Sequence, residues 1–272
     1  MINHRIEFFV ENHIAHVKLS RADKMNALDS KMLDAIPMVG ERIRQDSSIR
    51  VVVISGDGGN FCAGLDKSNF SSILDKKGIS VNDDDTVTVL ADRTHGIANA
   101  VQYVAWMWRE LPMPVIAAVE GFCLGGGLQI ALGADFRYAK ANSKFSILEM
   151  RWGIVPDMSS TQIMRHMIRD DVIRELTYTA KIFNAEQAKE WGFITEIVDD
   201  PLAKAMTVAN QIVNKNPDAI RASKKIIDAS YYQTAEQGLL MESVEQDKIM
   251  GTPNQIEAVI AELQKRKPEF KD

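Results

Sequence analysis

The stretch Pro114–Phe136, PVIAAVEGFCLGGGLQIALGADF, decides the fold. It begins with a continuous apolar run, which is typical of a strand buried on both faces of a sheet. Three glycines, Gly125 to Gly127, stand where such a strand would pass into a helix. The same order occurs earlier, where IRVVVISG at 49–56 leads into the glycine-rich GDGGNFCAGLD at 56–66. This repeated order predicts an α/β fold of parallel βαβ units, whose ligands lie at the carboxyl ends of the strands.

The flanking segments add a hairpin and several helices to this core. Residues 6–10 and 14–19 alternate between apolar and polar side chains and predict a β-hairpin, and residues 29–46 have the spacing of a helix. Helical spacing then dominates the last third of the chain. We therefore expect a ligand-binding core over residues 1–200 and a C-terminal helical region over residues 201–272.

The composition excludes several classes of function. The chain has 272 residues, of which 46% are hydrophobic and 25% are charged, as in soluble globular proteins with a large core. A formal net charge of −5 gives no overall attraction to nucleic acid or to an anionic membrane, which favours a small-molecule ligand. The two cysteines come without a secretory signal pattern, so we expect a cytoplasmic protein. The histidines lack metal-ligand spacing, and no metal site is expected.

The two glycine turns are the first candidates for a functional site. The first turn of a helix leaves backbone N–H groups without internal partners. If both turns meet at one edge of the sheet, the N–H groups of Ala63 and Gly126 would hold one oxygen atom from two sides, as in an oxyanion hole. The alternative is that the glycines only allow close packing. Neither turn has the dinucleotide fingerprint or the Lys-Ser/Thr ending of a phosphate-binding loop.

Two carboxylates, Glu149 and Asp157, flank residues 152–156, which would form a rigid apolar wall for a ligand. Desolvation in such a setting raises the pKa of a carboxyl group and makes its ionised form a stronger base. Both residues also have simpler interpretations. Glu149 would pair with Arg151 or Arg137, and Asp157 would be the N-cap of the helix that follows it.

Taken together and in this order, the motifs resemble the crotonase superfamily of enoyl-CoA hydratases and isomerases. The resemblance covers nearly the whole chain and includes KMNALD at 24–29, FCAGLD at 61–66, the stretch 114–139, FSILEMRWGIVPD at 145–157, residues 176–198 and KRKPEFKD at 265–272. It implies a spiral of βαβ turns, with C-terminal helices that pack the chain into a homotrimer or homohexamer. It also implies an acyl-CoA thioester as the substrate, and no metal or redox cofactor.

The resemblance also implies roles for individual residues. The amides of Ala63 and Gly126 would hold the thioester oxygen and stabilise an enolate. The positions that match the CoA-contacting region are Lys24, Ala27, Leu65, Asp66 and Lys265. Lys265 would reach CoA across a subunit boundary, although it is equally a residue of a solvated basic tail.

Gln129 decides which reaction the sequence predicts. Hydratases of this family carry a glutamate at this position. An amide neither takes nor gives a proton at neutral pH, so hydration would lose one acid–base group and a factor of about 100 to 10,000 in rate. A single glutamate at the Glu149 position is what enoyl-CoA isomerases use. Asp157 resembles the second acid of dienoyl-CoA isomerases, which carry an aspartate at the Gln129 position. Gln129 itself would orient Glu149 or a water.

We therefore predict an acyl-CoA double-bond isomerase, which converts 3-enoyl-CoA or 3,5-dienoyl-CoA into the conjugated 2-enoyl-CoA or 2,4-dienoyl-CoA. One alternative is an enoyl-CoA hydratase, as in fatty-acid oxidation. The other is a non-catalytic homologue that binds acyl-CoA or RNA, which the acidic balance of charge disfavours.

Overall fold

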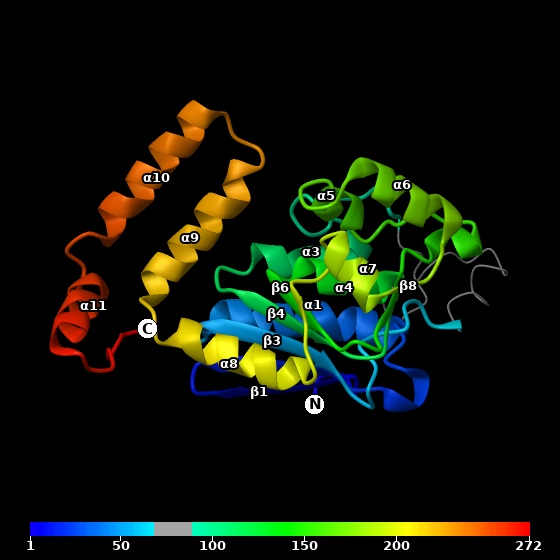
Figure 1. Ribbon diagram of the computed structural model, residues 1–272, viewed down its shortest axis with the longest axis horizontal. Helices are drawn as coiled ribbons and strands as arrows, with labels where there is room; N and C mark the ends of the chain where they lie inside the picture. The colour runs from blue at the N-terminus through cyan, green and yellow to red at the C-terminus, as the bar shows by residue number, and fades with distance from the viewer. Residues whose placement is uncertain (68–88) are drawn as a thin grey trace.

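The protein is described by a computed structural model, which covers residues 1–67 and 89–272 in detail (Figure 1). Its main sheet has six strands, in the order β1-β2-β3-β4-β6-β9. These are β1 (Ile6–Glu11), β2 (Ile14–Leu19), β3 (Val51–Gly56), β4 (Val115–Val119), β6 (Phe136–Ala139) and β9 (Glu196–Ile197). The first two strands form the predicted antiparallel hairpin, and all further pairings in this sheet are parallel.

The two apolar runs of the sequence form β3 and β4 in the middle of this sheet, where side chains are buried on both faces. On one face, Val52 and Ile54 join the large core beneath α1 (Ser30–Gln45), α3 (Ala100–Glu110) and α4 (Gly126–Gly133). On the other face, Val51 and Val53 pack with α8 (Pro201–Val213). Because successive side chains of a strand point to opposite faces, both faces need apolar residues. The prediction of a parallel α/β core is confirmed.

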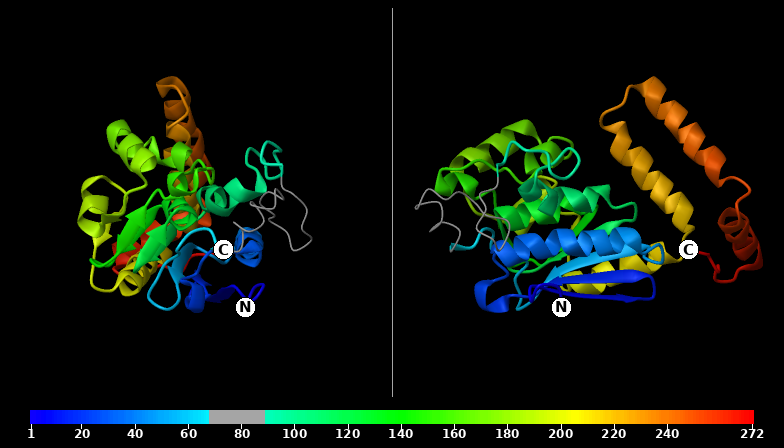
Figure 2. Two further views of the ribbon diagram at one scale, coloured as in Figure 1. Left: turned by 90° about the vertical axis from the view of Figure 1, so that its right-hand side faces the viewer. Right: turned by 180° about the vertical axis from the view of Figure 1, so that it is seen from behind.

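α8 belongs with the sheet and not with a separate helical region. Its residues Ala205 and Ala209 are fully buried against the sheet. The helices that project from the body are α9 (Pro217–Ser230), α10 (Ala235–Ile249) and α11 (Pro253–Gln264), as Figures 1 and 2 show. The boundary expected at residue 200 therefore falls before a helix that completes the core.

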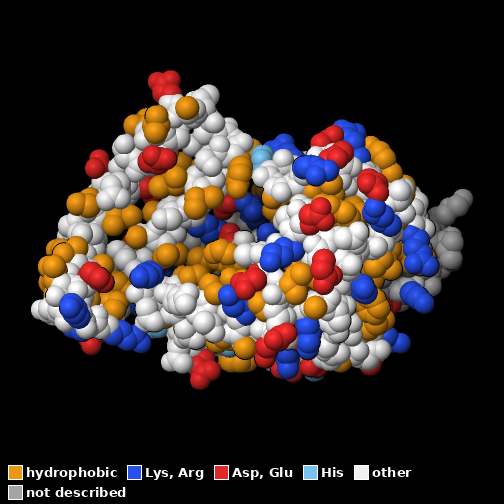
Figure 3. Space-filling model, viewed as in Figure 1, with side chains coloured by type: hydrophobic (Ala, Val, Ile, Leu, Met, Phe, Trp, Pro, Cys, Tyr) orange, Lys and Arg blue, Asp and Glu red, His pale blue; other side chains and the backbone are white. Residues whose placement is uncertain are grey.

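The projecting helices expose many apolar side chains, among them Leu239, Leu240 and Leu263. Figure 3 shows such side chains in orange along this part of the molecule. Within the described ranges, no helix has both the length and the apolar character that crossing a membrane requires.

Short elements connect the core strands around the future site. A second sheet contains β5 (Phe122–Leu124), β7 (Lys144–Ser146) and β8 (Phe183–Asn184). The remaining helices are η1 (Ala22–Lys24), η2 (Glu149–Trp152), α5 (Ser160–Met164), α6 (Asp170–Thr179) and α7 (Ala185–Glu190). β5 leads from β4 into α4, and β7 leads into η2, so this small sheet brings the second glycine turn close to Glu149.

Candidate active site

The two glycine turns are in direct contact, as the sequence predicted. The N–H of Cys62 donates to the Phe122 carbonyl at 2.9 Å, and the N–H of Leu124 donates back to the Cys62 carbonyl at 3.0 Å. Gly64 has a left-handed φ of +86°, and a Cβ atom there would lie 2.7 Å from the Leu124 carbonyl oxygen. Only glycine allows both this φ and this approach of the two backbones. The turns after β3 and β4 therefore form one surface.

The Ala63 amide is not available for an oxyanion hole, which corrects the prediction. Its N–H donates to the Met25 carbonyl oxygen at 3.0 Å. A donor that is already bonded in this way would have to break that bond before it could hold a substrate oxygen.

Leu65 supplies the open donor instead. The Leu28 N–H donates to the Gly64 carbonyl, and the Asp66 N–H donates to the Leu28 carbonyl, as in a parallel bridge. In such a ladder the residue between the two bonded groups directs its own N–H to the other side. The Leu65 N–H accordingly has no backbone acceptor in the described part of the chain. The same holds for the Gly126 N–H at the start of α4.

Both open amides lie at a cavity of about 600 Å³. The predicted residues that line it are Lys24, Ala27, Ala63, Leu65, Asp66, Gly126 and Glu149. Two cations that the sequence analysis did not assign to CoA, Lys67 and Arg151, line it as well. Each stands within two residues of a predicted site residue, and this nearness was the only signal in the sequence. With Lys24 they give the lining three cations, beside the acidic residues Asp23, Asp66 and Glu149.

Glu149 is buried at the start of η2, with 6% of its surface exposed. Its Oε1 atom accepts a hydrogen bond of 2.6 Å from Nε2 of Gln129. The Oε1 atom of Gln129 in turn accepts from the backbone N–H groups of Met158 and Ser160, at 2.9 and 3.2 Å. Since an amide oxygen cannot donate, these two bonds direct the NH₂ group of Gln129 toward Glu149.

The second carboxylate oxygen of Glu149, Oε2, is buried and has no hydrogen-bond partner among the described residues. Burial raises the pKa of Glu149, the hydrogen bond from Gln129 opposes this effect, and the charge of nearby Asp157 adds to it. The site therefore holds a carboxyl group with one fixed oxygen, one open oxygen and increased basicity.

The ion-pair alternative for Glu149 is wrong. Arg137 is buried elsewhere and donates to the backbone carbonyls of Phe193 and Ala134. Arg151 lines the cavity but forms no salt bridge with Glu149 in the described structure. Within the described ranges, the Glu149 carboxylate therefore has an amide as its hydrogen-bond partner and forms no ion pair.

Asp157 lies beside this cavity and not within it. It lines a separate hollow of about 250 Å³ together with Pro156 and Trp106. The N-cap position of α5 belongs to Ser159, so the interpretation of Asp157 as a helix cap is wrong. Burial also raises the pKa of Asp157. The predicted apolar wall is divided in the same way, since Ile154 lines the Glu149 cavity and Pro156 lines the smaller hollow.

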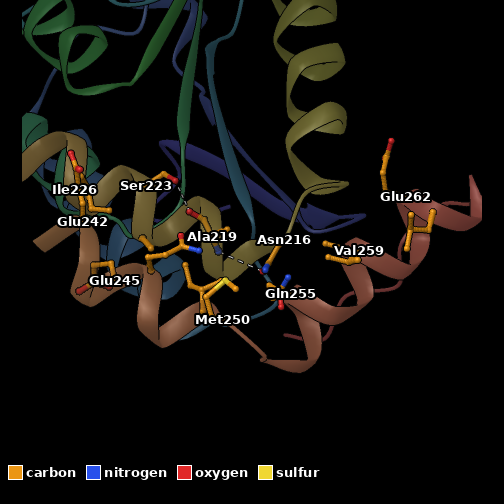
Figure 4. Close-up of a pocket in the computed structure, with 15 residues that line it drawn as sticks. Asn216, Ala219, Ser223, Ile226, Glu242, Glu245, Met250, Gln255, Val259 and Glu262 are labelled. Carbon is orange, nitrogen blue, oxygen red and sulfur yellow. Dashed lines mark hydrogen bonds between the residues drawn. The ribbon is translucent and has the colours of Figure 1, made fainter. Parts of the chain in front are cut away.

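A third hollow, of about 560 Å³, lies among the projecting helices α9 to α11 (Figure 4). Its polar lining includes Glu242, Glu245 and Glu262, which would repel an anionic ligand. Lys265 ends α11, beyond α9 and α10, and does not line the Glu149 cavity of its own chain. Within residues 1–67 and 89–272, no group of three or more His, Cys, Asp or Glu side chains is arranged to hold a metal ion.

Comparisons with known proteins agree with this geometry. A family model described as enoyl-CoA hydratase/isomerase matches residues 10–272. A probable mitochondrial enoyl-CoA hydratase 2 of Arabidopsis thaliana is 32% identical over 95% of this chain and 81% of its own length. A peroxisomal Delta(3,5)-Delta(2,4)-dienoyl-CoA isomerase of the same plant is 27% identical over 96% and 93% of the two chains.

Solved structures show the same fold. The crystal structure of an enoyl-CoA hydratase from Bacillus anthracis has a TM-score of 0.84 and 26% sequence identity, and the match covers 98% of this chain and 99% of that one. The resemblance to the crotonase superfamily is thereby confirmed. The chain belongs to the enoyl-CoA hydratase/isomerase family and is an enzyme of that family.

Proposed function

We propose that this enzyme moves a double bond in an acyl-CoA thioester, from 3-enoyl-CoA or 3,5-dienoyl-CoA to the conjugated 2-enoyl-CoA or 2,4-dienoyl-CoA. The observation that supports this most directly is the contact between Gln129 and Glu149. The amide donates to one oxygen of the carboxylate and leaves the other open. Because an amide does not exchange protons at neutral pH, residue 129 cannot act as the second proton-transfer group that a hydratase would need beside Glu149.

In the proposed reaction, the thioester oxygen lies between the N–H groups of Leu65 and Gly126. These donors stabilise the negative charge that develops on the oxygen when a proton leaves the adjacent carbon, and one such donor typically contributes a factor of about 100 to 1000 in rate. Oε2 of Glu149 takes the proton from C2 of a 3-enoyl chain and returns it to C4. No atom is gained or lost, and no metal or redox cofactor is required.

For a 3,5-dienoyl chain, Asp157 is the second proton-transfer group. Glu149 would take the proton from C2, and Asp157 would deliver one to C6, which leaves double bonds at C2 and C4. The carboxyl groups would then return to their starting states by proton exchange with water. Burial raises the pKa of Asp157, which favours the protonated form that this role requires. The chain must extend from the Glu149 cavity toward the smaller hollow.

We further propose that CoA binds along Lys24, Ala27, Leu65 and Asp66, with Lys67 and Arg151 near its phosphates. The carboxylate of Asp66 is paired with Arg21, so its charge is partly offset. Lys265 would reach CoA only from a neighbouring subunit, in a homotrimer or homohexamer. The exposed apolar side chains of α9 to α11 support such packing. A cytoplasmic location and the absence of nucleic-acid binding remain predictions.

Hydration of a 2-enoyl-CoA is the second candidate function. The open Oε2 atom of Glu149 would activate a water molecule, and the 32% identical Arabidopsis relative is named as a hydratase. The purified enzyme should be offered a 3-enoyl-CoA, a 3,5-dienoyl-CoA and a 2-enoyl-CoA in parallel, while the absorbance of the conjugated thioester is followed. Conversion of the first two with negligible hydration supports the isomerase. Rapid hydration of the third would refute it.

A further inference from the structure

The smaller hollow beside the Glu149 cavity has no role in the proton transfers, apart from Asp157 at its edge. We infer that it binds the far end of the acyl chain and favours a chain that ends in an uncharged hydrogen-bonding group, such as a hydroxyl or a carbonyl. This inference rests on the proposed function, because it describes the substrate of the same site.

The hollow lies between residues 93–106 and residues 156–162 and has a volume of about 250 Å³. Gln129 lies between the hollow and the catalytic cavity, since its NH₂ group bonds Glu149 of the cavity and its oxygen accepts from the N–H of Ser160, whose neighbours Ser159 and Thr161 line the hollow. A hollow of this size fits the end of a chain.

The path of the chain follows from the lining. Ile154 faces the Glu149 cavity, Pro156 faces the hollow, and Asp157 lies at the hollow beside Pro156. A chain whose C2 atom is at Glu149 and whose more distant carbons are at Asp157 points into this hollow. Every atom beyond that position has to be accommodated there.

The chemistry of the lining is mixed. Ile97, Trp106 and Pro156 give it an apolar side, whereas Ser159, Thr161 and Gln162 give it a polar side. Thr161 and Gln162 are exposed and bond each other, but a plain alkyl end would leave the buried hydroxyl of Ser159 without a partner, which is costly. The lining thus matches a chain end with both an apolar and a hydrogen-bonding part.

Ser159 has a buried hydroxyl group that a polar ligand atom could bond. Only 9% of the residue is exposed, and its hydroxyl oxygen is buried without a hydrogen-bond partner among the described residues. Its backbone has a left-handed φ of +73°, which is unusual for a residue other than glycine. Such conformations cluster at sites that bind ligands, and buried hydroxyl groups normally have partners. A polar atom of the substrate would satisfy this hydroxyl.

Charge selects against a carboxylate at the chain end. Arg93 lines the hollow, and its guanidinium is held by the carbonyls of Leu90 and Ala91 and by the side chain of Gln102. The Arg93 guanidinium thus already has three acceptors, and an anionic end gains little from it. Asp157 lines the same hollow and repels an anionic end whenever its carboxyl group is ionised. An uncharged polar end avoids the repulsion.

Binding of unreactive ligands tests this inference without turnover. Isothermal titration calorimetry should compare saturated acyl-CoA thioesters of equal chain length that end in a methyl, a hydroxyl or a carboxylate group. We expect the hydroxyl-ended ligand to bind at least as tightly as the methyl-ended one. Ser159→Ala should reduce the ratio of the two affinities about tenfold, the effect of one hydrogen bond. Ser159→Gly, which suits the left-handed φ, should show the same loss.

Three results would overturn the inference: preference for the methyl end, an affinity ratio that Ser159→Ala leaves unchanged, or tightest binding of the carboxylate end. A loss in the alanine variant alone would assign the effect to the backbone and would also overturn it. Turnover of a 3-enoyl-CoA too short to reach the hollow tests the proposed function separately. If the short substrate reacts while the tail preference is absent, only the tail inference fails.

Discussion

Replacing Gln129 by glutamate should place a second acid beside Glu149 and so test the proposed isomerase function. In Gln129→Glu, one carboxylate oxygen can still accept from the Met158 and Ser160 N–H groups, which lie 2.9 and 3.2 Å from the present amide oxygen. The other oxygen then takes the place of Nε2, which is 2.6 Å from Oε1 of Glu149. A donor is thereby replaced by a second acceptor, and the two groups cannot both be ionised without strong repulsion.

The size of this repulsion follows from the geometry. With the two charges about 4 Å apart and an effective dielectric constant of about 20, their interaction is about 4 kcal/mol. That energy disfavours the doubly ionised pair by about a thousandfold. The pair should therefore keep one shared proton near neutral pH. Glu149 is then less available as a free base, while the site acquires the combination of acid and base that adds water to a double bond.

The assay follows both reactions as a function of pH. For Gln129→Glu we expect hydration of 2-enoyl-CoA to rise by about 100-fold or more, and isomerisation of 3-enoyl-CoA to fall and to move its pH dependence upward. Gln129→Met is the matched control, because it removes the hydrogen bond to Glu149 at similar size and adds no charge. It should slow isomerisation without any gain in hydration.

Two results would refute this reasoning. If Gln129→Glu gains no hydration, the identity of residue 129 does not separate the two reactions in this enzyme. If isomerisation and its pH dependence stay as in the unmodified enzyme, Glu149 is not the base, or its carboxyl group is not held by residue 129 as the structure shows.

Three further predictions test the remaining groups. Glu149→Gln should lower isomerisation about 100 to 10,000-fold. Burial raises the pKa of Glu149, so ionisation of its carboxyl group lowers the stability of the folded enzyme as the pH rises through that pKa. The glutamine variant cannot ionise at this position. It should therefore melt at a higher temperature than the unmodified enzyme at neutral pH, and the difference should vanish in acid. Asp157→Asn should reduce turnover of a 3,5-dienoyl-CoA far more than that of a 3-enoyl-CoA; equal losses would contradict the relay. Gly126→Pro should be about 100 to 1000-fold slower than Gly126→Ala. Both variants add a Cβ near Leu28 and Met158, but only proline removes the backbone N–H. Proline is tolerated at this first position of α4. Similar rates for these two variants would exclude Gly126 as an oxyanion donor.

The elements that depend on local pattern could be predicted from the sequence. Val51–Ile54 of β3 and all of β4 are apolar because each strand has helices on both faces. What the pattern could not show is which helix lies on which face. α8 has an amphipathic spacing, as α9 does, and this spacing does not reveal that Ala205 and Ala209 pack on the sheet.

The choice between Ala63 and Leu65 shows a second limit of the sequence. The glycine turn marks a place where backbone N–H groups become available, but it does not tell which of them another segment has already bonded. That depends on Met25, about forty residues earlier in the chain, whose carbonyl accepts from Ala63. A bond between segments so far apart has no periodicity that could reveal it.

The chemistry of Gln129 could be predicted from the sequence, but the orientation of its amide group could not. The residue type alone excludes proton transfer at neutral pH. Whether the amide presents its oxygen or its NH₂ group to Glu149 depends on the Met158 and Ser160 N–H groups, which bind the oxygen. Those two residues lie one and three positions after Asp157, so the turn that carries the second acid also orients the first. A substitution that displaces this turn should therefore disturb both carboxylates together, even where it touches neither of them.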